Sequence, residues 1–116
     1  MTAGLDSIQT LIVDDNRQMR HLLREMLRGL GLRKVEEAGD AIEALELMRT
    51  MPIDLVLLDW AMQPLDGLEC ARMLRSAADS PNPFCSIIMI SGHANRGRVR
   101  EARDAGVNSF LVKPVS

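Results

Sequence analysis

Cysteine is scarce in this chain. The 116 residues include two cysteines, Cys70 and Cys85, with no CxxC spacing and no secretory signal before them. This pattern argues against a disulfide framework or a cysteine zinc site. It is typical of buried thiols in a protein core.

Long hydrophobic runs are also missing. The apolar run from Ile53 to Leu58 is far shorter than the roughly 20 residues that a membrane-spanning helix needs. The first residues, Met1 to Asp6, lack the basic region and apolar core of a secretory signal. We therefore expect a cytoplasmic protein without membrane insertion.

Neither sign of charge dominates. Charged residues make up 26% of the chain and the formal net charge is -2, so direct nucleic-acid binding is not expected. The arginines at 96, 98, 100 and 103 make one predicted helix basic. A solvated helix face is the simplest explanation, with a partner-binding face or a local nucleic-acid contact as the alternatives. With 47% hydrophobic residues, residues 1–116 are predicted to form a single domain.

Two kinds of apolar pattern alternate along the sequence. Short continuous runs predict strands at 8–13, 34–38, 53–59, 86–90 and 107–112. Runs with apolar residues every three or four positions predict helices at 16–30, 40–50, 68–74 and 96–105. This alternation predicts an α/β domain with a doubly wound, five-stranded parallel sheet, whose ligands bind beyond the carboxyl ends of the strands.

No helical pattern follows the last predicted strand. Only two residues come after Pro114, so we expect this chain to be truncated before a fifth helix. Such an open flank would expose apolar surface beside the first helix and the fifth strand, which favours pairing with added sequence or a second copy in a homodimer.

Polar residues gather at the predicted carboxyl ends of the strands. They are Asp14 and Asp15 after the first strand, Asp59 after the third, Ser91 after the fourth and Lys113 after the fifth. A helix N-cap explains one residue near the first strand end, most naturally Asn16. A turn aspartate or a solvated lysine would explain each of the others alone, but not their convergence at one sheet edge.

The charge of this group implies a cation. Three carboxylates and one lysine sum to -2, which is repulsive in a partly desolvated crevice unless a positive ion joins them. The ligands are oxygens, with no metal-binding cysteine or histidine pattern, and this chemistry favours Mg²⁺.

Four segments resemble the motifs of the response regulator receiver domain. They are Leu11-Ile12-Val13-Asp14-Asp15-Asn16, Asp59 to Gly67, Ile90-Ser91-Gly92 and Val112-Lys113-Pro114. The resemblance covers nearly the whole chain, and it implies a flavodoxin-like sheet of strand order 2-1-3-4-5.

The resemblance also implies a function and the residues that perform it. Asp59 is the expected phosphoacceptor for a sensor histidine kinase or a histidine phosphotransfer protein. The expected Mg²⁺ site comprises Asp14, Asp15, Asp59 and the backbone carbonyl of Ala61, with Asp14 orienting a metal-bound water. Lys113 and Ser91 are expected to contact the phosphoryl group.

The expected output is a signalling switch and not turnover of a separate substrate. Ser91 and the aromatic Phe110 match the switch positions of the family, so their movement is expected to alter the face that binds a downstream protein or output domain. Self-catalysed phosphotransfer and autodephosphorylation are the only reactions expected.

Besides the expected missing fifth helix, the sequence departs from the family pattern in two places. Proline stands at position 64 and not directly after Met62, and Ala61 and His93 flank the expected path of attacking water. His93 itself is expected to be a solvent-facing loop residue. Lys113-Pro114 matches a family dipeptide whose peptide bond is typically cis, although trans is the default from the sequence alone.

The same residues leave one alternative function open and argue against two others. A pseudo-receiver, which binds protein partners without phosphorylation, is the alternative. An aspartate-nucleophile phosphatase needs a DxD pattern, and a flavin protein needs a hydroxyl-rich phosphate loop, and the strand ends contain neither.

Overall fold

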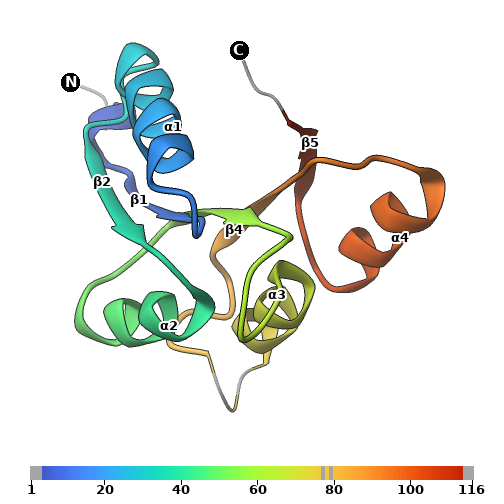
Figure 1. Ribbon diagram of the computed structural model, residues 1–116. Coiled ribbons are helices and arrows are strands. Elements are labelled where there is room, and N and C mark those ends of the chain that lie inside the picture. Colours follow the sequence, from blue (N-terminus) through green and yellow to red (C-terminus); the bar gives the residue numbers. More distant parts are fainter. Residues whose placement is uncertain (1–3, 77, 79, 114–116) are drawn as a thin grey trace.

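A five-stranded parallel sheet lies at the centre of the protein (Figure 1). The computed structural model describes residues 4–76, 78 and 80–113. The strands are β1 (Gln9–Val13), β2 (Lys34–Ala38), β3 (Leu55–Asp59), β4 (Ser86–Ser91) and β5 (Ser109–Val112). Their order is β2-β1-β3-β4-β5, which confirms the fold class and the strand order expected from the sequence.

A helix follows each of the first four strands. They are α1 (Arg17–Gly29), α2 (Ala41–Thr50), α3 (Gly67–Arg75) and α4 (Arg96–Asp104), and a short 3-10 helix, Leu5–Ser7, precedes β1. The predicted elements are thus all present, but β1, β3 and β5 begin one or two residues later than the apolar runs do. Apolar side chains continue into the loops before these strands, so hydrophobicity alone could not locate their first ladder hydrogen bonds.

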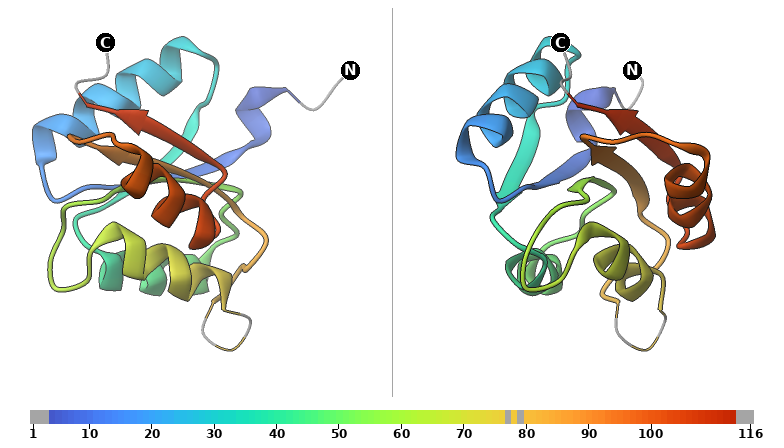
Figure 2. Two further views of the ribbon diagram at one scale, coloured as in Figure 1. Left: turned by 90° about the vertical axis from the view of Figure 1, so that its right-hand side faces the viewer. Right: turned by 45° about the vertical axis from the view of Figure 1, so that its right-hand side comes forward.

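The helices cover the two faces of the sheet unequally. Figure 2 shows α1 on one side and α2 and α3 on the other. Side chains of α2, α3 and α4 share one buried cluster with alternate strand residues such as Val56 and Leu58. Leu23 and Leu27 of α1 pack in a second cluster with Leu57 and Ile90. Strands that bury both faces in this way have continuous apolar sequences, as β3 has here.

Helix α1 is less buried than its apolar stripe predicted. Leu23 and Leu27 are buried, but Leu30 is 65% exposed and Leu22 is 40% exposed. Leu30 lies just beyond the last helical residue, where Gly31 adopts a positive φ of 97° and turns the chain. Periodicity placed these two leucines on the core side, whereas the end of the helix and the sparse cover around α1 leave them in solvent.

Asparagine and aspartate side chains determine where the helices begin. Asn16 accepts a hydrogen bond from Met19 N at 2.9 Å, as expected for the N-cap of α1. Asp40 caps α2 in the same way, although Glu43 bonds the Gly39 N–H and not the N–H of Asp40 that a capping box would use. The reciprocal capping box occurs at α3, between Asp66 and Glu69, and the sequence analysis did not predict it.

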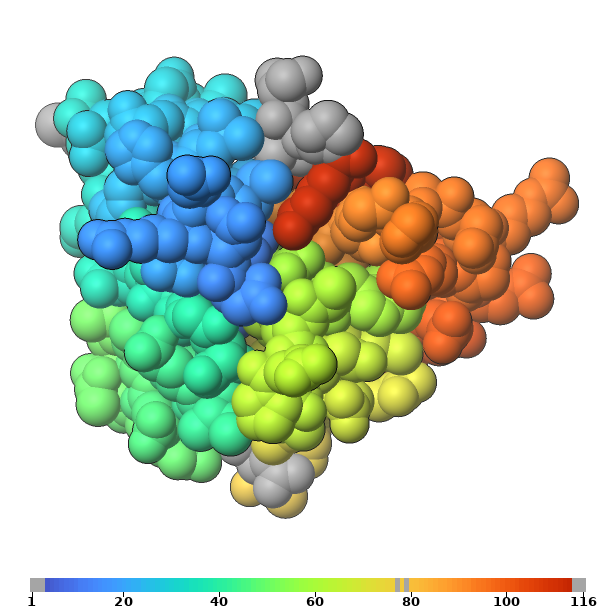
Figure 3. Space-filling model, in the orientation of Figure 1, coloured from blue at the N-terminus to red at the C-terminus, as the bar shows by residue number. Residues whose placement is uncertain are grey.

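The flank of the sheet beside β5 is open within the described residues. Leu111 and Val112 of β5 are both nearly half exposed, in line with the apolar surface expected there. Helix α4 projects beside this strand, as the orange surface in Figure 3 shows.

Cys70 and Cys85 are both buried, and burial raises the pKa of the Cys70 thiol to about 12. Among the described residues, no helix is both long enough and apolar enough to cross a membrane.

The strand register brings the polar strand ends together. Val13 pairs with Leu58, Asp59 pairs with Ile90, and Ser91 pairs with Val112. All strands run in the same direction, so the residues that follow β1, β3 and β5 meet at one edge of the sheet.

Candidate functional site

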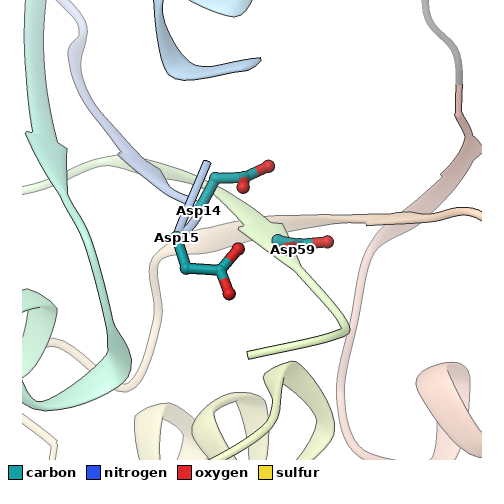
Figure 4. Close-up of side chains that lie close together, drawn as sticks. All are labelled: Asp14, Asp15 and Asp59. Carbon is teal, nitrogen blue, oxygen red and sulfur yellow. The ribbon is translucent and has the colours of Figure 1, made fainter. Parts of the chain in front are cut away.

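Three carboxylates converge beyond the ends of β1 and β3 (Figure 4). One ligand oxygen from each of Asp14, Asp15 and Asp59 lies within 4.8 Å of the others. Asp14 and Asp59 are buried, at 1% and 4% exposure, whereas Asp15 is exposed. The structure therefore assembles the acidic group that the sequence placed at adjacent strand ends.

Lys113 joins this group from the end of β5. Its Nζ atom lies 3.2 Å from Asp14 Oδ2 and 3.0 Å from Asp59 Oδ1. The backbone N–H of Lys113 donates to Ser91 O at 2.7 Å, which holds the lysine against the end of β4. One ammonium thus bridges two buried carboxylates from strands far apart in the sequence.

The electrostatics of the site reflect its burial. Loss of solvent raises the pKa of Asp59, and the negative charges of Asp14 and Asp15 raise it further, while Lys113 acts in the opposite direction. Burial alone would lower the pKa of Lys113, but its hydrogen bond and attraction to Asp59, together with Asp14, raise it. The lysine remains charged, and the four groups keep a net charge of -2 when all are ionised.

A cavity opens beside the acidic group. Its volume is about 310 Å³, and it is lined by Asp15, Ala61, Met62 and Gln63. Its position places the exposed Asp15 carboxylate and the backbone of the loop after β3 next to solvent-accessible space. Oxygen ligands, excess negative charge and room for water are what a Mg²⁺ ion requires, so the residues present fit this ion.

The loop after Asp59 folds back on itself before α3. Gly67 N and Met62 N both donate to Trp60 O, at 2.7 and 3.1 Å. The Gln63–Pro64 peptide bond of this loop is cis. Pro114 lies outside the described residues, so the conformation of the Lys113–Pro114 bond stays untested.

The buried Ser91 hydroxyl faces α4. Its Oγ atom accepts hydrogen bonds from His93 N at 3.2 Å and from Arg98 Nη1 at 3.3 Å. His93 is exposed, which confirms it as a solvent-facing loop residue. Within the described residues, the hydrogen bonds of Ser91 Oγ go to this loop and to α4, and none joins it to Asp59.

The structure corrects the expectation that all four arginines of α4 lie on a solvated face. The arginines of α4 were assigned together to a solvated face, but Arg98 is part-buried and reaches the site. Its Cζ atom lies 4.4 Å from the centroid of the Trp60 ring. Ala102 and Ala105, four and seven positions later, are buried, so small residues at helical spacing marked the inward face on which Arg98 lies.

Phe110 packs against the residue that follows Asp59. The rings of Phe110 and Trp60 meet edge to face, with centroids 6.2 Å apart and planes at 71°. The structure thus places the expected aromatic switch residue in contact with the loop after β3. Trp60 links it to Arg98, a connection that the sequence analysis did not identify.

Arg20 is a second residue that the sequence analysis did not identify. Its Nη1 atom donates to the backbone carbonyl of Asp14 at 2.7 Å, and its Nε atom pairs with Glu37 at 3.0 Å. Arg24 pairs with the other oxygen of Glu37 at 2.7 Å. Arg20 therefore connects the turn that carries Asp14 and Asp15 to strand β2, through long-range contacts that no local motif predicts.

Comparisons with known proteins agree with this geometry. Residues 10–116 match the family model of the response regulator receiver domain. The chemotaxis protein CheY-3 of Vibrio cholerae is 35% identical over 108 residues, covering 93% of this chain and 82% of that protein.

Solved structures give the same result. The structure of Vibrio cholerae chemotaxis protein CheY4 superposes with a TM-score of 0.84 at 28% identity, covering 94% of this chain and 88% of that one. The receiver domain of the histidine kinase CKI1 from Arabidopsis thaliana, complexed with Mg²⁺, has a TM-score of 0.81 at 30% identity, with coverage of 92% and 83%.

Proposed function

Because this chain belongs to the response regulator receiver domain family of two-component systems, we propose that it is a signalling switch that phosphorylation of Asp59 controls. The donor is the phosphohistidine of a sensor histidine kinase or of a histidine phosphotransfer protein. The observation that carries this proposal is the position of Asp59, which is buried beside Asp14 and Asp15 and paired with Lys113.

Asp59 acts as the nucleophile. A carboxylate oxygen attacks the phosphorus atom, an O–P bond forms, and the N–P bond of the phosphohistidine breaks with its electron pair passing to the imidazole, which takes up a proton. Lys113 keeps Asp59 ionised despite burial and then pairs with a phosphoryl oxygen. The product is an acyl phosphate at the end of β3.

The acidic group supplies the ligands for Mg²⁺. Asp14, Asp15, Asp59 and the backbone carbonyl of Ala61 would hold the ion, with Asp14 orienting a metal-bound water. When bound, the ion offsets negative charge on the transferring oxygens. Support comes from the -2 charge of the site, the cavity beside Asp15, and the related receiver domain complexed with Mg²⁺.

Ser91 and Phe110 carry the signal to the surface. The Ser91 hydroxyl donates a hydrogen bond to the new phosphoryl group, and the movement of its loop changes the packing around Trp60 and Phe110. The face formed by α4 and β5 then changes its affinity for a downstream protein or output domain.

The experiment is incubation of the chain with acetyl phosphate and Mg²⁺, followed by intact mass measurement. We expect one phosphoryl adduct in the wild type and none in Asp59→Asn. Asp54→Asn is the matched control, because Asp54 lies just before the amino end of β3 and is exposed. An absent adduct would contradict the proposal and favour a pseudo-receiver, whereas an adduct that survives Asp59→Asn would contradict the assignment of Asp59 as the phosphoacceptor.

A further inference from the structure

One arginine of α4 connects the two sides of the site. Arg96, Arg100 and Arg103 are exposed, whereas Arg98 is part-buried. Its guanidinium donates to Ser91 Oγ at 3.3 Å and lies over the ring of Trp60 at 4.4 Å. Arg98 therefore contacts both the residue next to the phosphoacceptor and the hydroxyl that is proposed to bind the phosphoryl group.

The Ser91 hydroxyl is held from the side of α4. A serine oxygen accepts two hydrogen bonds and donates one. Here the backbone N–H of His93 and the guanidinium of Arg98 occupy both acceptor positions. The oxygen is thus fixed by two donors, and only its own hydrogen is left to donate to a new acceptor.

Arg98 cannot follow Ser91 toward Asp59 without losing contacts of its own. Its backbone N–H bonds the Asn95 side chain at 2.8 Å in the first turn of α4, which anchors the start of the side chain. Its cation–π contact with Trp60 holds the other end. A Ser91 that is drawn toward a phosphoryl group must therefore separate from Arg98, or pull the guanidinium off the ring.

We propose that Arg98 is a positioning residue that holds Ser91 in the unphosphorylated conformation. In this arrangement Ser91 reaches the phosphoryl group only when its contact with Arg98 breaks. The contact thereby sets how strongly α4 resists activation. This inference rests on the proposed function of Asp59 and Ser91.

If Arg98 had a different role and bound the phosphoryl group, loss of Arg98 would change the affinity for an anion at Asp59 in the opposite direction. If the guanidinium instead bound the phosphoryl group, its loss would weaken the binding of an anion at Asp59. If it restrains Ser91, its loss releases the hydroxyl and strengthens that binding. The occupied Nη1 atom and the stacked ring face favour restraint.

The test is the affinity for beryllium trifluoride, which stands in for the phosphoryl group on Asp59, at a fixed Mg²⁺ concentration, measured by ¹⁹F NMR of the bound ligand. We expect Arg98→Met to bind about 3- to 10-fold more tightly than the wild type, the range given by one hydrogen bond of ordinary net strength. Arg100→Met is the matched control, since it removes the same charge from an exposed position of α4. It should bind no more tightly than the wild type.

A Ser91→Ala background separates restraint from a general effect. With no hydroxyl to hold, Arg98→Met should no longer tighten binding. Tightening that persists in Ser91→Ala, or Arg98→Met binding equal to or weaker than that of Arg100→Met, would overturn the proposal. If the wild type binds no beryllium trifluoride, the proposed function fails and this inference fails with it.

The emission of Trp60, the only tryptophan in the chain, tests the contact directly. Without ligand, Arg98→Met should alter this emission because the cation leaves the ring, whereas Arg100→Met should not. Equal spectra for the two variants would mean that the contact is absent in solution, and the proposed restraint would be wrong.

Discussion

Gly67 lies against the backbone of Asp59, the proposed phosphoacceptor. A Cβ atom added there would overlap Asp59 O and would lie 2.8 Å from Trp60 Cα and 3.0 Å from Asp59 C. These are backbone atoms, which cannot rotate away as a side chain can. The Gly67 N–H is also bonded to Trp60 O at 2.7 Å, so helix α3 cannot retreat without breaking this contact.

Gly67→Ala should therefore destabilise the protein and slow its phosphorylation. Overpacking of this kind costs about 3 kcal/mol at its upper range, and replacing a helical glycine returns up to about 1 kcal/mol. The net loss is about 2 kcal/mol, which lowers the midpoint of thermal unfolding by about 8 °C for a chain of this size. The displaced Asp59 should accept a phosphoryl group from acetyl phosphate about tenfold more slowly or worse.

Gly29→Ala is the matched control for this substitution. Gly29 ends α1, and an added Cβ there meets no atom within 4 Å. This variant should be more stable than the wild type by up to about 1 kcal/mol, with an unchanged rate of phosphorylation. The reasoning is refuted if Gly67→Ala unfolds at or above the wild-type temperature, or if it is destabilised yet phosphorylated at the wild-type rate.

Three further predictions concern side chains around the site and beneath the loops. Burial raises the pKa of Asp59 above the ordinary 3.8. Without Mg²⁺, the ionised form of Asp59 therefore lowers the free energy of unfolding, and this loss of stability disappears as the pH falls through the raised pKa. Asp59→Asn should thus be more stable than the wild type in urea at neutral pH with EDTA, by a margin that shrinks toward acid pH, and a less stable variant would contradict this. Arg20→Met should weaken Mg²⁺ binding in calorimetry by about tenfold because it frees the turn after β1, whereas Arg24→Met leaves that turn held and should not weaken binding. Unchanged or tighter binding in Arg20→Met would contradict this role of Arg20, since the loss of its positive charge by itself favours a bound cation. Arg75 donates to carbonyl and amide groups of the loops before β4 and β5. Arg75→Met should therefore lower the free energy of unfolding by about 3 kcal/mol, whereas Arg72→Met, at an exposed position, should lower it by at most about 0.5 kcal/mol. Equal losses in the two variants would disprove this role of Arg75.

The sequence alone was sufficient for the fold class and the acidic group. Continuous apolar runs such as the one that ends at Asp59 predicted strands buried on both faces, and parallel strands place their carboxyl ends at one edge. Because these rules are local or topological, Asp14, Asp15, Asp59 and Lys113 could be assigned to one site before any distance was known. The structure brings all four together.

The contacts that support this site depended on the tertiary structure. Arg20 was indistinguishable in the sequence from arginines on exposed helix faces. The spacing of Ala102 and Ala105 indicates the inward face of α4 on which Arg98 lies, but not the contacts of Arg98 with Ser91 and Trp60. The requirement for glycine at position 67 was equally hidden in the sequence, because its φ is not positive and the constraint is the close approach of the Asp59 backbone.

Sequence determines what is periodic or local in this protein: its strands, its helix caps and the polar residues at the strand ends. Only the packing of α4 against Trp60 decides that Arg98 holds Ser91, and only the path of the loop after β3 decides that Gly67 must lack a side chain. The physical reason is that such contacts join residues that the chain brings together only on folding, so their partners are set by the angle and distance between elements and not by neighbouring residues.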